Sequence, residues 1–352
     1  MSDVSLATPD AESLTYPLGR IPAPGEVIEV GPGVLWVRLP IPFQLDHINV
    51  WLIEDTDGWF IVDTGVATDD AKALWRKVFA THLMDKPIKG VIVTHLHPDH
   101  VGLAGWLTRK WNVDLHMSRI DFLSCRNLVL DTGREAPKEA LAFYRAAGFS
   151  ERGLDDYAQR FGNFGERVSR LPDTYRRLRE GDEMKIGDHI WRVVVGSGHA
   201  PEHVCLYCAD LKLFISGDQV LPRISSNVSV HPTDLSDNPL QEWIESCHRL
   251  RANLPADLLV LPAHNEPFMG LHLRLTSLID GHESSLAKLH DYLSEPRRAI
   301  DVFPALFKRK IVPDVFFLAT GESLAHLRCL IGRGLASVRR DDMGVDWYSR
   351  IG

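Results

Sequence analysis

The sequence predicts an α/β fold, because apolar runs of strand length alternate with segments whose apolar residues recur at helical spacing. Early apolar runs lie at residues 26–30, 33–40, 47–54 and 58–64. The turn sequence DTDG predicts that the last two form a hairpin. IKGVIVT, residues 88–94, is apolar throughout and is typical of a central strand.

Helices are predicted between these runs and after them. Residues 68–83 begin with acidic side chains, and residues 98–111 have proline in the first turn, both of which favour a helix start. Further strands are predicted at 113–118, 189–196, 203–210, 212–218 and 257–264, with helices at 239–253 and about 270–294. Most of the chain therefore follows one strand–helix rhythm.

Three segments depart from this rhythm and predict the domain organisation. Residues 1–25 are polar, carry four prolines and are interpreted as an N-terminal arm. Within an α/β domain at 26–294, residues 119–180 are aromatic, arginine-rich and predicted helical to their end at DTYRRLRE; they are interpreted as an inserted cap. Residues 295–352 have the helix–helix–hairpin order of a winged helix.

Composition narrows the classes of function. Of the 352 residues 45% are hydrophobic, which excludes global disorder, and the net charge of −8 disfavours a protein built to coat nucleic acid or an anionic membrane. We find no secretory signal, no run approaching the roughly 20 apolar residues that span a bilayer, and five scattered cysteines typical of reduced thiols. These features predict a cytoplasmic protein without membrane or nucleic-acid partners.

The winged-helix order of the tail raises the alternative that this segment binds DNA. Residues 295–352 hold ten Lys/Arg against seven Asp/Glu, which is a weak electrostatic footprint for DNA. We favour a packing or dimerisation role for this segment, which leaves a homodimer open.

Metal-capable side chains gather where predicted strands end. The cluster HLHPDH directly follows IKGVIVT, and each further candidate ends or follows another apolar run. The candidates are Asp63, His95, His97, Asp99, His100, His199, Asp218 and His264. Sheets of α/β proteins place ligands at the carboxyl ends of strands. A lone histidine is more often an ordinary hydrogen-bonded group, but repetition at several strand ends favours a metal site.

The spacing suggests two ions. His95 and His97 project to the same side, so that one ion would take both together with His199. Asp99 and His100, at the start of the next helix, would hold a second ion with His264, and Asp218 would bridge the two. Two such ions can share a hydroxide, which is a nucleophile near neutral pH. Zinc is favoured, with iron or manganese as alternatives, since imidazole and carboxylate suit all three.

The motif HxHxDH at 95–100, with Asp63, His199, Asp218 and His264 in order, resembles that of the metallo-β-lactamase superfamily. The resemblance covers about residues 26–290 and implies a four-layer αββα sandwich with a dinuclear site, in which Asp63 orients site residues. The turn GSGHAPEH, residues 196–203, is similar to the GHTPGH turn of the glyoxalase II-like and lactonase-like branches. The tail resembles the winged-helix-like segment of some glyoxalase II-like members.

These observations predict a metal-dependent hydrolase that attacks a small ester-like substrate, thioester or lactone first and aryl ester or phosphodiester next. Asp99 is the candidate for handling the proton of the hydroxide, and substrate choice is expected to lie in the cap. Candidate pocket residues are Phe143, Tyr144, Phe149, Tyr157, Phe161, Phe164, Tyr175 and Arg223, although buried aromatics usually pack. His47 and Trp51 are weaker pocket candidates, and both His47 and His231 are also interpreted as ordinary residues.

Two rival functions remain at this point. One is a sulfur dioxygenase with a single iron ion, similar to the persulfide dioxygenases that share this fold. The other is a nucleic-acid-binding regulator with a degenerate core. The complete set of second-site ligands disfavours the first, and the complete ligand set as a whole disfavours the second.

Overall fold

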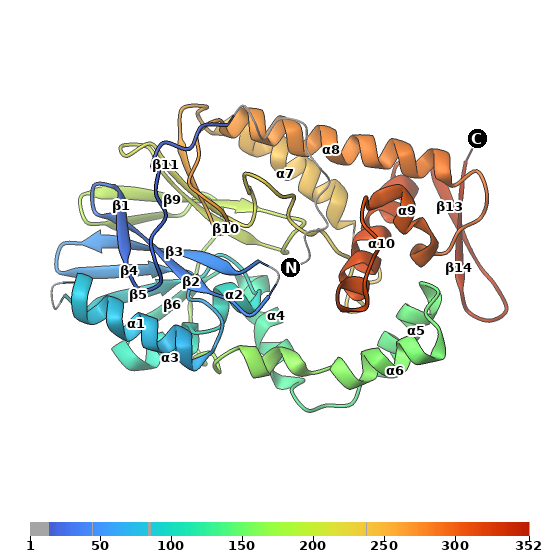
Figure 1. The fold of residues 1–352 in the computed structure, drawn as a ribbon, viewed down its shortest axis with the longest axis horizontal. Coiled ribbons are helices and arrows are strands. Elements are labelled where there is room, and N and C mark those ends of the chain that lie inside the picture. The colour runs from blue at the N-terminus through green and yellow to red at the C-terminus, as the bar shows by residue number, and fades with distance from the viewer. Residues whose placement is uncertain (1–13, 44, 84–85, 237, 352) are drawn as a thin grey trace.

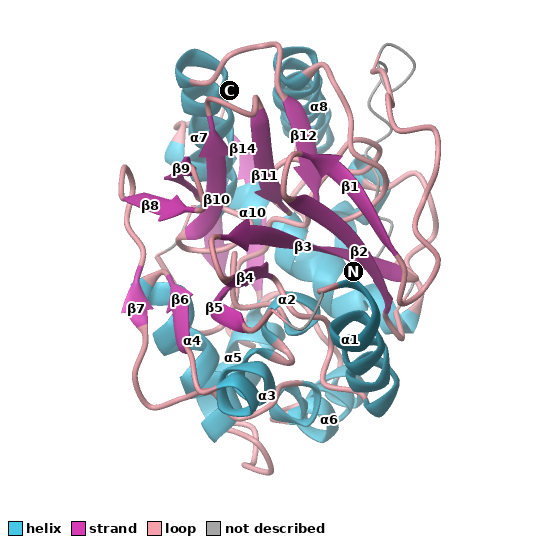
Figure 2. Ribbon diagram, turned by 90° about the vertical axis from the view of Figure 1, so that its left-hand side faces the viewer, coloured by secondary structure: helices cyan, strands magenta, loops and turns pink. Residues whose placement is uncertain are grey.

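Two β-sheets pack face to face, and helices cover the outer face of each (Figures 1 and 2). This computed structural model describes residues 14–43, 45–83, 86–236 and 238–351. The first sheet has the order β1-β2-β3-β4-β5-β6-β7 and the second the order β12-β11-β10-β9-β8. The predicted four-layer α/β architecture is therefore confirmed.

The first sheet changes from antiparallel to parallel at β4. Its strands are β1 (Val27–Gly31), β2 (Val34–Pro40), β3 (His47–Asp55), β4 (Gly58–Val62), β5 (Ile88–Ile92), β6 (Asp114–Met117) and β7 (Arg176–Arg177). Strands β1 to β4 pair antiparallel, whereas β4 to β7 pair parallel. The carboxyl ends of β4 and β5 consequently lie at one edge.

The second sheet brings two further carboxyl ends side by side. Its strands are β8 (Glu183–Ile186), β9 (His189–Gly196), β10 (His203–Cys208), β11 (Leu213–Gly217) and β12 (Leu259–Pro262). Strands β11 and β12 pair parallel, and the other pairs are antiparallel. Strand β8 was not predicted, because its four residues EMKI carry too short a pattern to distinguish it from a loop.

Tryptophans fill the space between the sheets. Trp36 and Trp51 stack with ring centroids 6.1 Å apart, and Trp191 from the second sheet joins the same buried cluster. Alternate residues of β3, such as Val50 and Leu52, belong instead to the cluster beneath the helices. Side chains of one strand thus serve two cores, as the period of two requires.

Helices close both outer faces. The first sheet is covered by α1 (Asp69–His82), α3 (Ala104–Trp111) and α4 (Arg119–Leu130), and the second by α7 (Pro239–Asn253) and α8 (Leu271–Tyr292).

The single helix predicted at 98–111 is interrupted, since α2 (Pro98–Val101) ends before Gly102. A Cβ at Gly102 would lie 2.4 Å from the carbonyl oxygen of Pro98 and 2.5 Å from that of Gly65. In the described ranges we see no helix with the length and apolarity of a membrane span.

The predicted insert contains α4, α5 (Lys138–Ala146), α6 (Glu151–Arg160) and the 3₁₀ turn η1 (Asn163–Arg167). The expectation that DTYRRLRE is helical was wrong, because Arg176 and Arg177 form β7 on the edge of the first sheet. The open hydrogen-bonding edge of β6 outweighs local helix propensity there.

The tail contributes η2 (Ala299–Val302), α9 (Phe303–Leu306), η3 (Pro313–Val315), α10 (Phe316–Gly332) and the hairpin β13 (Ala336–Arg340) with β14 (Asp346–Arg350). Helix α10 touches the insert, since Phe317 lies 5.5 Å from Tyr144 and Phe316 lies 5.0 Å from Phe149 between ring centroids.

Of the predicted arm, residues 1–13 lie outside the described residues, and the backbone of Thr15 forms hydrogen bonds with that of Met269. The division into arm, α/β domain and tail stays a prediction.

Replacing Trp191 with alanine should lower the free energy of unfolding by about 3–5 kcal/mol, because a fully buried indole between the sheets is lost. Its neighbour Ile190 is 41% exposed on the opposite face of β9. Ile190→Ala is the matched control and should cost less than about 1 kcal/mol. Urea denaturation measures both, and equal losses would contradict the inter-sheet position of Trp191.

Candidate metal centre

The eight candidate side chains meet at one edge of the two sheets. Asp63 follows β4 and the segment 95–100 follows β5, while the second sheet supplies His199 after β9, Asp218 after β11 and His264 after β12. Of the eight, His97 is half-buried, and the others are buried. The structure thus brings together every metal ligand that the sequence predicted.

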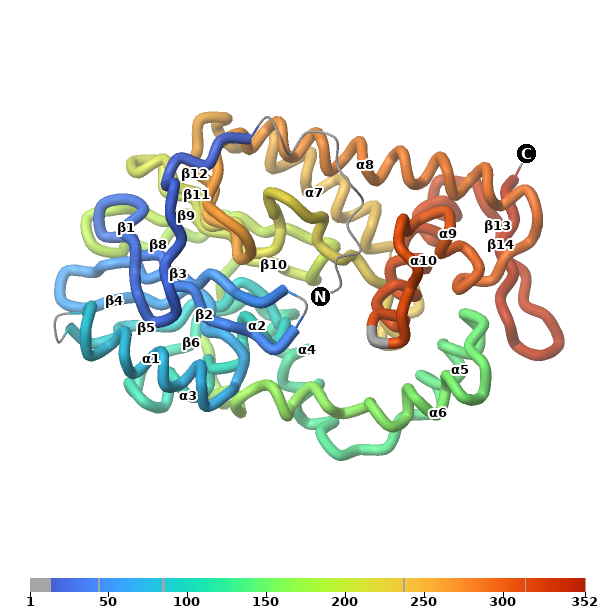
Figure 3. The backbone as a smooth tube through the Cα atoms, in the orientation of Figure 1, coloured from blue at the N-terminus to red at the C-terminus, as the bar shows by residue number. Residues whose placement is uncertain are grey.

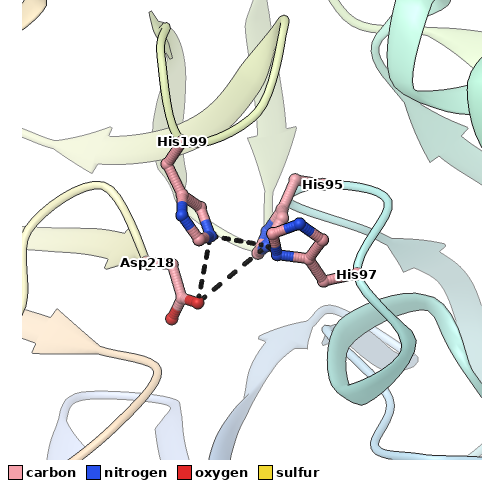
Figure 4. Close-up of side chains that lie close together, drawn as sticks. All are labelled: His95, His97, His199 and Asp218. Atoms are coloured by element: carbon pink, nitrogen blue, oxygen red, sulfur yellow. Dashed lines mark hydrogen bonds and ion pairs between the residues drawn. The ribbon is translucent and has the colours of Figure 1, made fainter. Parts of the chain in front are cut away.

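Three imidazoles form the first cluster (Figure 4). Nε2 of His95 lies 2.9 Å from Nδ1 of His97 and 3.2 Å from Nε2 of His199. A carboxylate oxygen of Asp218 lies 3.2 Å from Nε2 of His199 and 4.0 Å from that of His95. Four ligand atoms therefore point at a common centre.

The second cluster lies on the other side of Asp218. Nε2 of His264 is 3.4 Å from Oδ2 of Asp99, and Nε2 of His100 is 3.7 Å from the same oxygen. Asp218 directs Oδ1 at His264, 3.3 Å away, and Oδ2 at His100, 3.5 Å away. Its carboxylate thus lies within 4.0 Å of histidines of both clusters.

The hydrogen bonds of the ring nitrogens assign the tautomers. Nδ1–H of His199 donates to the carbonyl oxygen of Asn227 at 2.7 Å, and Nδ1–H of His264 donates to that of His47 at 2.8 Å. Nδ1–H of His100 donates to Asp63 at 2.8 Å. In each ring the lone pair of Nε2 is therefore left facing the cluster, as metal-binding histidines require.

Several of these inward atoms have no hydrogen-bond partner within the described part of the chain. They are Oδ2 of Asp99, Nε2 of His100, both carboxylate oxygens of Asp218 and Nε2 of His264. Unpaired buried polar atoms are costly. A divalent cation beside Asp218 would satisfy these atoms, so the residues fit a metal ion.

The charges of the side chains in the centre also favour a bound cation. Burial, together with neighbouring histidines, lowers the pKa of His95 and His97 well below the ordinary value, which keeps these rings neutral and able to bind metal. Burial alone would raise the pKa of Asp99 and Asp218, but His100 and His264 hold both below the ordinary range. Burial likewise opposes a charge on His100, yet Asp63, Asp218 and Asp99 raise its pKa. The carboxylates thus create a field that favours cations.

Asp63 lies behind the centre. Its backbone is left-handed, with φ of 62°, a strained conformation for a residue with a side chain. Thr94 N–H donates to Oδ1 at 2.8 Å, and the Thr94 hydroxyl lies 2.9 Å from Oδ2. With His100 also bound to Oδ2, this carboxylate has the contacts of a group that orients a ligand.

Two supporting residues were not predicted. Asp121, buried on α4, accepts from Leu96 N–H at 3.0 Å and from Glu202 N–H at 2.9 Å, which ties the loop after β5 to the turn after β9. His203 accepts from the backbone N–H of Asp218 at 3.1 Å and stacks on His95 at 4.6 Å. The quoted turn GSGHAPEH contains His203, whereas no sequence signal singled out Asp121.

A cleft of about 970 Å³ opens over the centre. His97, Asp99 and His199 lie among its lining residues, next to residues of the insert and the tail. The other lining residues are Pro42, Phe43, Pro98, Arg160, Asn163, Phe164, Arg167, Asn227, Ser229, His231, Val315 and Leu318. Phe164 was a predicted pocket aromatic, and His231 was interpreted as ordinary.

The other predicted substrate-binding residues do not line this cleft. Tyr144 is buried and packs on Phe317, and Tyr157 lies 4.4 Å from Tyr144 between ring centroids. Both belong to the apolar contact between insert and tail. Arg223 pairs with Glu266 at 3.2 Å and lies over the ring of Tyr16. The sequence could not show which face of each segment the tail would cover.

Asp121→Asn should weaken divalent-metal binding tenfold to a hundredfold, because its single amide oxygen can accept from Leu96 or from Glu202 but not from both, and the loop at residues 95–97 loosens. Chelator competition on the purified protein measures the affinity. Asp114→Asn, which removes an exposed partner of Arg176, is the control and should leave it unchanged. Identical affinities in all three proteins would refute a supporting role for Asp121.

Comparisons with known proteins agree with this geometry. The family profile described as metallo-beta-lactamase superfamily matches residues 44–264, and a profile described as metallo-beta-lactamase-like, C-terminal domain, matches residues 286–351. The crystal structure of a beta-lactamase domain protein from Burkholderia ambifaria is 37% identical, with a TM-score of 0.89 over 98% of this chain and 99% of that one.

Curated relatives are more distant. The probable metallo-hydrolase YqjP of Bacillus subtilis is 25% identical over 84% of this chain and 92% of its own length. A linear primary-alkylsulfatase of a Pseudomonas species is 25% identical, covering 68% of this chain and 45% of that protein. The human acyl-coenzyme A thioesterase MBLAC2 is 23% identical, covering 68% and 80%. The chain therefore belongs to the metallo-beta-lactamase superfamily, as a metal-dependent hydrolase.

Proposed function

We propose that this chain hydrolyses thioesters with two divalent metal ions. One ion would be held by His95, His97 and His199, and the other by Asp99, His100 and His264, with Asp218 shared between them. The observation that carries this proposal is the pair of candidate metal-binding groups around Asp218, one made with His95, His97 and His199 and one made by Asp99, His100 and His264. In the second group the inward atoms of all three residues have no hydrogen-bond partner among the described residues.

The bound ions would supply Lewis-acid polarisation of the substrate oxygen and a water acidic enough to be a nucleophile near neutral pH. The chain's own residues orient and enclose the reaction. Asp99 lines the cleft, and the histidines beside it hold its carboxyl ionised, so that it can accept a proton released there. Because its pKa is low, Asp99 would relay this proton rather than keep it.

The cleft supports a substrate with an anionic portion. Arg160 and Arg167 line it at the end of the insert, and the guanidinium of Arg167 lies 5.0 Å from the ring centroid of Phe43. A thioester of coenzyme A carries phosphates that suit guanidinium groups and a base that suits an aromatic ring. The relative MBLAC2, an acyl-coenzyme A thioesterase, points to the same substrate class.

Alkyl sulfate esters are the second candidate. The relative named linear primary-alkylsulfatase motivates this class, and a sulfate group would also suit the arginines. Lactones and aryl esters rank below these two, because they are commonly neutral and give the arginines no anion to bind. Phosphodiesters also rank below, because none of the relatives described above is named for that activity. The complete second cluster argues against a single-iron dioxygenase. Zinc as the metal, a cytoplasmic location and a homodimer stay predictions from the sequence.

Purified protein should bind two divalent ions per chain, and Asp218→Ala should weaken both sites and lower hydrolysis at least about a hundredfold, because one carboxylate serves both clusters. Elemental analysis and thioester turnover measure the two effects. Asp210→Ala, at an exposed carboxylate beside the β10–β11 turn, is the control and should change neither. Turnover by Asp218→Ala at the parent rate would refute the two-ion mechanism, and a single iron with oxygen consumption would replace it by the dioxygenase.

Arg167→Met should raise KM for acyl-coenzyme A about tenfold or more and leave kcat within about twofold, because a hydrogen bond to a charged group is lost during binding. The measurement is a substrate panel of acyl-coenzyme A, alkyl sulfates, lactones, aryl esters and phosphodiesters at defined metal loading. Arg170→Met is the control, since the Arg170 side chain is 80% exposed. An equal rise in KM for a neutral ester would rule out anion recognition by Arg167.

A further inference from the structure

The segment between β11 and α7 carries a contact to the metal centre. Asn227 in this segment accepts the Nδ1–H of His199 on its backbone carbonyl, at 2.7 Å. This hydrogen bond fixes the tautomer of the ring and the direction of its Nε2. The position of His199 therefore depends on whatever holds residue 227 in place.

Helix α10 of the tail holds this segment at three points. The side-chain amide of Asn227 donates to Oε2 of Glu322 at 2.9 Å. Val230 N–H donates to the carbonyl oxygen of Gly321 at 3.1 Å. A Cβ at Gly321 would lie 2.7 Å from the hydroxyl of Ser229, so the close approach requires glycine there. Figure 3 shows α10 between the end of α8 and the insert.

A second chain of contacts runs through the same helix. His326, one turn after Glu322, donates from Nδ1 to the Glu322 carbonyl oxygen at 2.8 Å, and its Nε2 lies 3.3 Å from Nδ1 of His282. Nε2 of His282 lies 3.0 Å from the hydroxyl of Ser225. The segment is thus hydrogen-bonded to α8 before Asn227, through Ser225, and to α10 after it, through Val230.

Glu322 is unusual for a residue with a packing role only. Its side chain is 3% exposed, and Asn227 is the partner that the described residues give it by hydrogen bond. Burial raises the pKa of its carboxyl to about 8. An apolar side chain would fill this space at a lower cost, so the presence of an acid at this position needs another explanation.

We propose that Glu322 is a positioning residue of the metal centre, which acts through Asn227 on His199 and makes the tail part of the active site. The proposal rests on the two-ion site proposed above. It assigns a role in the His95–His97–His199 site to a residue more than a hundred positions later in the chain. The reaction chemistry is unchanged, and Glu322 is not a catalytic residue.

Glu322→Met tests the proposal, because methionine fills a similar volume without an acceptor for Asn227. Zn²⁺ titration of the metal-free protein against a chelator should show one of the two affinities lowered tenfold to a hundredfold, with the other within about threefold. The unfolding temperature of the metal-free protein should be unchanged or higher, since a buried acid is removed. Glu322→Gln keeps an acceptor and should retain both affinities within about threefold.

Asn227→Ala tests the same contact from the other side and should lower the same affinity. The double variant Asn227→Ala/Glu322→Met should lose no more than either single variant, because both remove one contact. Arg333→Met is the matched control, since it breaks the contact of α10 with Glu283 on α8, 2.7 Å long, away from Asn227. It should lower the unfolding temperature and leave both Zn²⁺ affinities unchanged.

Three results would overturn the proposal: parental Zn²⁺ affinities in Glu322→Met, an equal affinity loss in Arg333→Met, or additive losses in the double variant. If the parent protein itself binds fewer than two Zn²⁺ ions, the two-ion function fails instead. The failure of the inference and the failure of the proposed function are thereby distinguished, because the first requires two ions in the parent protein.

Discussion

The convergence of buried histidines and carboxylates around Asp218 is the constraint on which the rest of the structure depends. Five inward atoms have no hydrogen-bond partner among the described residues, and His100 and His264 lie 3.3–3.7 Å from the carboxylates of Asp99 and Asp218. Burying such groups is costly unless opposite charges or a metal ion compensate for the lost water. The surrounding structure must therefore hold these groups together, and bound cations would offset part of the cost.

Two sheets with a shared apolar core hold the centre in place. The candidate ligands follow strands of both sheets, and Trp51 and Trp191 of these sheets belong to one buried cluster between them. Additional hydrogen bonds then fix the orientation of individual rings. Asp63, Asp121 and the carbonyl of Asn227 each hold a different part of the centre. These three contacts come from residues outside the candidate ligand set.

Local patterns predicted the centre well and its surroundings poorly. The ligands could be found because each follows an apolar run, and strand ends are places where the chain must converge. Asp121 and Glu322 lie inside helices, where an acid normally faces water, and only the tertiary structure shows that they are buried. Tyr144 and Arg223 lie outside the lining of the cleft, and their role in substrate binding stays a prediction, since sequence periodicity does not tell which segment covers a helix face. The short strand β7 depended on pairing with β6, which no local pattern contains.

The ring contacts between the insert and α10 have a consequence for how such enzymes can be rebuilt. Phe149 and Tyr144 of the insert interlock with Phe316 and Phe317, which begin the helix that carries Glu322. A graft of the insert from a relative would thus leave those phenylalanines facing an unmatched surface. Exchanging both segments together would preserve these ring contacts, so the insert and the tail are best transplanted as a pair, although they lie far apart in the sequence.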